Sequence, residues 1–80
     1  MKNTPEKIDI TGKMIRLGQL LKMANLVENG GEAKARIQNG EVLINGEVDT
    51  RRGRQLSEGD VIEIAGQQLQ VHYTGEDPGD

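Results

Sequence analysis

Three arginines crowd one short stretch of the sequence, Arg51, Arg52 and Arg54. A guanidinium group is planar and permanently charged, and its paired N–H donors match the oxygens of a phosphate. This composition favours binding to a phosphate-bearing partner. A solvent-exposed turn without a ligand is the alternative, and the spacing of the arginines does not separate the two interpretations.

Other basic side chains could join this loop in one patch. Arg16 and Lys13 stand just before a predicted helix, and Lys22 lies on the polar side of that helix. Lys34 lies at the rim of a second predicted helix, and Arg36 lies on another face of it or at its edge. If the two helices lie against a sheet, the arginine loop comes beside the second helix and the positive charges meet.

No set of residues in the sequence is typical of an enzyme. There is no Cys, and the one histidine, His72, has no Ser or Cys nucleophile candidate nearby. The carboxylates are scattered without the spacing of metal ligands, so we expect no catalysis, no metal and no cofactor. Asn29-Gly30-Gly31 is expected to cap a helix. Its bare N–H groups could also admit a phosphate, which the neighbouring Glu32 would oppose.

The composition is that of one small globular domain. The chain has 80 residues, 34% of them hydrophobic, which suffices for a small two-layer core. No apolar run reaches the roughly 18 residues that span a bilayer, and residues 1–11 lack the apolar stretch of a signal peptide. We expect a cytoplasmic protein with no membrane partner and no small-molecule substrate. The single aromatic, Tyr73, argues against a base-stacking platform.

The formal net charge of −3 is unevenly distributed along the chain. Residues 1–54 hold all 10 Lys and Arg with 7 acids, whereas residues 55–80 hold 6 acids and no Lys or Arg. Such an asymmetry points to a charged interaction surface. Folding could mix the two parts, so the asymmetry supports a basic patch without defining it.

The hydrophobic spacing predicts a strand, two helices and then a run of strands. Ile residues alternate with polar neighbours over 8–10, as in a short strand. Apolar residues recur at helical spacing over 17–25. Asn29 with Glu32 has the pattern of a capping box, and Gly40 is placed to end the second helix.

Asn45-Gly46 is the strongest signal in the second half of the chain, because a type I′ hairpin turn needs positive φ at both central residues. The strands predicted around and after it cover residues 42–44, 47–50, 61–64 and 67–73. This order predicts a small α+β domain. The expected plan is a loose segment over 1–7, one domain over 8–73 and an acidic disordered tail over 74–80.

Several stretches together resemble a known family. They are Arg16–Lys22, Glu32-Ala33-Lys34 with Ile37 and Gly40, Val42 with Asn45-Gly46-Glu47-Val48, Thr50-Arg51, and Gly59–Ile64. This pattern, which covers residues 15–64, resembles the RNA-binding domain of ribosomal small-subunit protein S-four, also called the alpha-L motif. The Gly-Gly-Glu-Ala-Lys and Arg-Arg-Gly-Arg stretches resemble the small stand-alone bacterial members of the YaaA/YbcJ group.

The resemblance implies a helix hairpin packed on a small, mostly antiparallel sheet. It also implies non-catalytic binding of structured RNA, often ribosomal or transfer RNA, and we expect a monomer. The family motif maps onto Arg16, Lys34 and Arg51 as RNA contacts, and Arg52 and Arg54 extend that loop. With the basic residues chosen above for their placement, the predicted RNA-binding set is Arg16, Lys34, Arg51, Arg52, Arg54, Lys13, Lys22 and Arg36.

The chain departs from the family pattern at two places. Asn29-Gly30 stands where the family often has Ser-Arg, and Gly18 stands in place of the usual Asp after Arg-Leu. The first helix therefore lacks that aspartate as a cap.

Two other functions fit parts of the sequence. β-Grasp sulfur carriers also show Asn-Gly-Glu-Val and a later Gly-Asp-x-Ile/Val-Glu-Ile. Their chemistry requires a C-terminal Gly-Gly, which the ending Asp77-Pro78-Gly79-Asp80 disfavours. A protein-interaction module whose acidic tail meets a basic partner is the second alternative.

Overall fold

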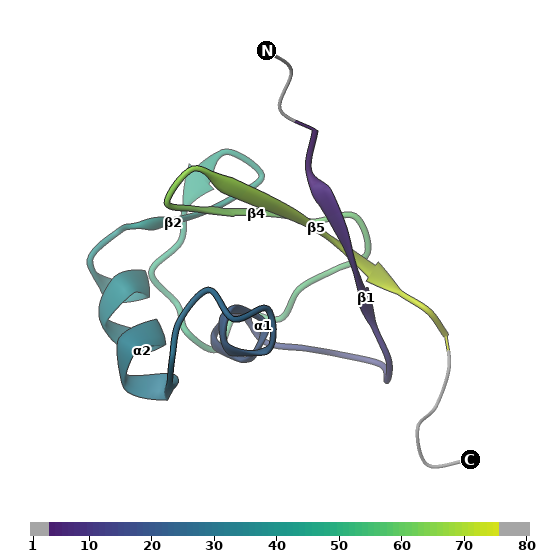
Figure 1. The fold of residues 1–80 in the computed structure, drawn as a ribbon, viewed down its shortest axis with the longest axis horizontal. Helices are drawn as coiled ribbons and strands as arrows, with labels where there is room; N and C mark the ends of the chain where they lie inside the picture. Colours follow the sequence, from purple (N-terminus) through teal and green to yellow (C-terminus); the bar gives the residue numbers. More distant parts are fainter. Residues whose placement is uncertain (1–3, 76–80) are drawn as a thin grey trace.

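Two helices cover one face of a five-stranded sheet (Figure 1). The computed structural model describes residues 4–75. Its elements in chain order are β1 (Glu6–Ile10), α1 (Leu17–Met23), α2 (Gly30–Gln38), β2 (Val42–Ile44), β3 (Glu47–Val48), β4 (Val61–Ile64) and β5 (Gln67–Tyr73). The strand order is β1-β5-β4-β2-β3, and only β1 with β5 is parallel. The predicted α+β fold, a helix hairpin on a mostly antiparallel sheet, is confirmed.

The hydrophobic core lies between the two helices and the sheet. Side chains alternate along each strand, so one set faces the helices and the other faces away. The helices bury their apolar residues at helical spacing against that inner set. The largest fully buried side chains are Leu17, Leu20, Leu21, Ile37, Val42, Ile62, Ile64 and Val71.

Each helix stops where one residue adopts a left-handed backbone. That residue is Asn25 after α1 (φ 60°) and Gly40 after α2 (φ 77°), and in both cases the next N–H donates back across the last turn. The ending predicted at Gly40 is confirmed. α1 stops at Met23, earlier than the predicted range 17–25, because Asn25 already leaves the helix. Neither helix, in the part of the chain that the structure describes, is long and apolar enough to cross a membrane.

α2 begins at a side-chain cap. The Oδ1 atom of Asn29 accepts a hydrogen bond from the N–H of Glu32 (2.9 Å), as predicted. The Glu32 carboxylate reaches one residue further back than a capping box requires, and its Oε1 accepts from the N–H of Glu28 (2.7 Å). The predicted Asn29 cap is therefore confirmed, but the second hydrogen bond of the capping box forms with Glu28 and not with Asn29.

The Asn45-Gly46 turn joins β2 to β3 with positive φ at both residues, 54° and 85°, as predicted. The Asn45 amide also ties this turn to β4. Its Nδ2 donates to Oδ1 of Asp60, and its Oδ1 accepts from the N–H of Val61, each at 3.0 Å. β3 has only two residues, fewer than the predicted 47–50, because the buried Asp49 turns into the following loop.

β1 starts at Glu6, two residues before the predicted strand, and pairs in parallel with β5. Glu6 and Lys7 therefore belong to the sheet and not to a loose segment over 1–7. At the other end, the N–H of Thr74 donates to the carbonyl of Ile10 (3.0 Å). Residues 4, 5 and 75 are described but lie in no helix or strand, and residues 1–3 and 76–80 of the two predicted terminal segments lie outside the described residues.

Tyr73 joins three segments at one end of the core. Its hydroxyl donates to the carbonyl of Leu56 (2.7 Å) and accepts from the N–H of Ile15 (3.0 Å). Ile15 and Leu56 are also linked directly, through a backbone hydrogen bond of 3.0 Å. The ring itself packs against the core. The phenol therefore fixes the segment that leads into α1.

Replacing Tyr73 with phenylalanine should lower the unfolding free energy by about 1–3 kcal/mol, because two part-buried backbone groups lose their partner while the ring stays. The measurement is a thermal melt followed by circular dichroism. Gln67→Ala, an exposed change on the same strand, is the control and should shift stability by at most about 0.5 kcal/mol. Equal melting temperatures for the two variants would show that the hydroxyl contributes nothing.

Candidate functional site

The arginine loop, residues 49–54, is held against the first turn of α1. The N–H of Leu17 donates to the carbonyl of Arg54 (2.9 Å), and the N–H of Gly18 donates to the carbonyl of Arg52 (3.0 Å). The first N–H groups of a helix have no partner inside it. The loop carbonyls therefore supply the cap that the sequence of α1 lacks.

Gly18 allows the arginine loop to come this close. A Cβ atom at this position would lie 2.8 Å from Cγ of Arg52 and 3.5 Å from the Arg52 carbonyl oxygen. Any side chain here would push Arg52 away from the helix. The glycine that stands in place of the family's aspartate thus allows the loop to pack directly against α1.

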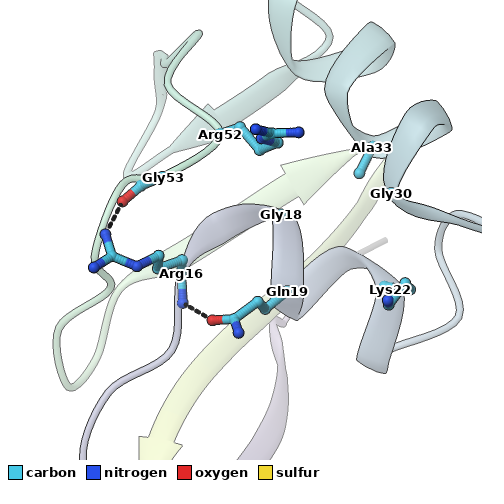
Figure 2. A pocket seen from close by; sticks show the side chains of 8 residues that line it. All are labelled: Arg16, Gly18, Gln19, Lys22, Gly30, Ala33, Arg52 and Gly53. Atoms are coloured by element: carbon cyan, nitrogen blue, oxygen red, sulfur yellow. Dashed lines mark hydrogen bonds between the residues drawn. The ribbon is translucent and has the colours of Figure 1, made fainter.

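A hollow of about 380 Å³ opens between this loop, α1 and the start of α2 (Figure 2). We call it the basic groove, and its lining residues are Arg16, Gly18, Gln19, Lys22, Gly30, Ala33, Arg52 and Gly53. Half of these residues are Gly or Ala. Small side chains in the wall leave room for a ligand and bring backbone within its reach.

Three cationic side chains surround the basic groove. Figure 2 shows Arg52 extending from its loop toward α2, while Lys22 projects from α1. Both are exposed, and neither forms an ion pair with an acidic side chain of residues 4–75. Arg16 is exposed as well and donates to the carbonyl of Gly53 (2.9 Å). The groove therefore carries positive charge that no carboxylate of the described chain neutralises.

The other two arginines of the loop bind Asp49, whose side chain is 7% exposed. Its carboxylate accepts from Nε and Nη2 of Arg51 (3.0 and 2.8 Å) and from Nη1 of Arg54 (2.6 Å). These bonds, with the Arg51 side chain foremost, favour the ionised carboxylate and hold the pKa of Asp49 well below its usual range. In the sequence the three arginines look equivalent. In the structure two of them pair with Asp49, and Arg52 does not.

Three further predicted contacts lie outside the lining of the basic groove. Arg36 is half-buried and ion-paired with Glu32 (3.1 Å) and Glu41 (3.4 Å). Lys13 and Lys34 are exposed and have no ion pair among the described residues, but they are not lining residues. Of the eight predicted residues, the structure gathers Arg16, Lys22 and Arg52 at one site.

The lining residues are suited to binding an anion. Guanidinium and ammonium groups donate strong hydrogen bonds to phosphate oxygens. The Gln19 side chain accepts from the N–H of Arg16 through Oε1 (3.0 Å), so its amide is held at the groove edge. No three His, Asp or Glu side chains within residues 4–75 gather as metal ligands would. His72 lies against Glu58 (3.0 Å) and takes no part in the groove.

A comparison with protein families identifies the domain. The model of the S4 domain matches residues 8–72, which is most of the chain. The chain belongs to the S4 domain family. This S4 match also decides against the β-grasp sulfur carrier considered from the sequence.

Two relatives of this S4 domain are similar over most of their length. RlbA from Bacillus subtilis (strain 168), named a probable ribosome maturation protein, is 52% identical over 59 residues, which are 74% of this chain and 83% of that protein. YbcJ from Escherichia coli (strain K12) is 35% identical over 57 residues, 71% of this chain and 81% of that protein. The solution structure of E. coli YbcJ, described as an alfaL motif involved in RNA-binding, matches with a TM-score of 0.64 at 30% identity. That match covers 90% of this chain and 92% of the other.

Sequence reasoning missed two features of this site. One is the role of Asp49, for which a signal exists: an Asp can accept the N–H two residues later, as Asp49 does from Arg51 (2.9 Å). The other is the wall of small residues, including Gly18 and Gly53. No local pattern predicts this wall, because it arises where α1 meets a loop 37 positions away.

Proposed function

We propose that this S4 domain binds structured RNA without catalysis, and that the basic groove receives the backbone phosphates. The observation that carries the proposal is the gathering of Arg16, Lys22 and Arg52 around one hollow, with no carboxylate of residues 4–75 paired to them. In the same loop Asp49 pairs with Arg51 and Arg54, whereas the three groove cations have no such carboxylate among residues 4–75. The groove leaves its charges for a partner.

The relatives support the same class of ligand. The YbcJ fold is described as involved in RNA-binding, and RlbA is named for ribosome maturation. We therefore propose ribosomal RNA as the target and transfer RNA as the competing candidate, with the chain acting as a monomer in the cytoplasm. Neither relative's description names a reaction, which agrees with a binding module.

Recognition should rest on phosphates, 2′-hydroxyls and RNA shape. The single aromatic, Tyr73, uses its hydroxyl inside the fold and is not a lining residue of the groove. The groove therefore offers unpaired bases no aromatic ring on which to stack. We therefore expect folded RNA to bind more tightly than an unstructured strand of equal length.

Salt should weaken this binding in proportion to the number of phosphate contacts. With the three groove cations engaged, the slope of log affinity against log salt should be about −2 to −3. Fluorescence anisotropy with a hairpin fragment of ribosomal RNA, at several potassium chloride concentrations, measures it. An unstructured RNA of the same length and a transfer RNA are the comparison ligands. A flat salt dependence would contradict the phosphate contacts.

A further inference from the structure

We infer that Asp49 is a positioning residue for RNA binding: it shapes the arginine loop so that Arg52 is held over the basic groove. The inference rests on the proposed function of the groove. It assigns an acidic residue, which by charge alone opposes RNA, a favourable role in binding it.

The contacts of Asp49 close the arginine loop on itself. Oδ1 accepts from the backbone N–H and the Nε of Arg51 (2.9 and 3.0 Å), and Oδ2 accepts from Nη2 of Arg51 and Nη1 of Arg54 (2.8 and 2.6 Å). The carboxylate thus bonds to the backbone at one position of the loop and to side chains at two. Because Asp49 is buried while Arg51 is 69% exposed, the carboxylate is the fixed point and the arginines gather on it.

The closed loop is also the part that meets α1. Between the two arginines that hold Asp49 lies Arg52, whose carbonyl accepts from Gly18, while the carbonyl of Arg54 accepts from Leu17. A further bond from the N–H of Arg54 to the carbonyl of Arg51 (3.2 Å) tightens the turn. The backbone on both sides of Arg52 is therefore fixed. Its side chain extends from the loop toward α2, as Figure 2 shows, and lines the groove.

Charge and positioning predict opposite results when Asp49 is neutralised. Asp49→Asn removes a negative charge and releases the side chains of Arg51 and Arg54, so electrostatics alone would tighten RNA binding. If Asp49 positions Arg52, the same change loosens the loop, and ordering it again on binding weakens the affinity. For one rotamer-rich side chain and its loop, that loss is about threefold to tenfold. Asp49→Glu keeps the charge but moves the carboxylate by one methylene, so it should also weaken binding.

The experiment measures the affinity of the ribosomal RNA hairpin fragment for five proteins: the parent, Asp49→Asn, Asp49→Glu, Arg52→Ala, and Asp49→Asn combined with Arg52→Ala. Thermal melts identify the temperature at which each is folded. Both Asp49 variants should bind about threefold to tenfold more weakly than the parent. In the Arg52→Ala background the Asp49→Asn effect should fall below about twofold, because the residue that it positions is absent.

Each contrary outcome has a separate meaning. Tighter binding by Asp49→Asn, or an undiminished loss in the Arg52→Ala background, overturns the positioning role while leaving the groove in place. If neither Asp49 variant folds at any temperature, Asp49 is a folding determinant and the inference is also overturned. If Arg52→Ala itself binds RNA as tightly as the parent, the proposed function of the groove has failed.

Discussion

Replacing Ile37 with alanine should remove much of the stability of this domain. Ile37 is fully buried between α2 and the sheet, and truncating such a residue costs about 2–5 kcal/mol of unfolding free energy. A chain of this length has only about 4–12 kcal/mol in total. RNA binding should fall with the folded fraction, because α2 forms one wall of the basic groove.

Urea unfolding followed by circular dichroism measures this loss. Ile37→Val is the matched control, since it keeps the β-branched shape, removes one methyl group and should cost about 0.5–1.5 kcal/mol. If Ile37→Ala and Ile37→Val unfolded at the same urea concentration, α2 would not be anchored to the core at this position.

Replacing Arg52 with alanine should have the opposite profile, with a large effect on RNA binding and little on stability. The Arg52 side chain is exposed and has no ion pair within residues 4–75, and it is the Arg52 carbonyl that holds α1. Hydrogen bonds to a charged group contribute about 1.5–3 kcal/mol, so affinity should fall by about tenfold or more. The salt slope should become shallower by about 1, while the melting temperature stays near that of the parent.

Lys7→Ala is the control for Arg52→Ala, because it removes the same charge at a distance from the groove. Lys7 pairs with Gln70 across β1 and β5 and alternates with Ile8, which packs against the core, so it faces away from the helices. Only the screened long-range charge is lost there, and the affinity should change by less than about twofold. Equal losses for the two variants would mean that RNA responds to net charge and not to the basic groove.

The sequence predicts the fold well wherever a local signal also satisfies the tertiary structure. The Asn45-Gly46 turn needs positive φ. At the two ends of α2, Asn29 and Gly40 allow the unpaired backbone groups of the helix to form hydrogen bonds without help from distant segments. The end of α1 is less predictable, because Asn25 also fits the helical spacing. Its left-handed backbone depends on the tertiary structure, in which Leu26 packs against the core. The start of β1 depends on pairing with β5, which no pattern in its own residues shows.

The site is harder to predict, because it depends on which charges meet. The sequence shows the arginine cluster and several separate lysines. It does not show that Asp49 binds Arg51 and Arg54, or that Arg52 remains unpaired and lines the groove. The spacing of Glu32 and Arg36 is that of an i,i+4 helix pair, but nothing in the sequence indicates that Glu41 also pairs with Arg36. Loop and side-chain geometry decides these pairings.

Binding of RNA at the basic groove is tested most directly by an NMR map of backbone amide shifts during titration with the ribosomal RNA hairpin fragment. We expect the largest shifts at Gly18, Lys22 and Gly53 and little change at Gln68 and Gln70, which alternate with the inward-facing residues of β5. If the largest shifts fell on that outer face of the sheet and the groove amides did not shift, RNA would bind elsewhere than at the basic groove.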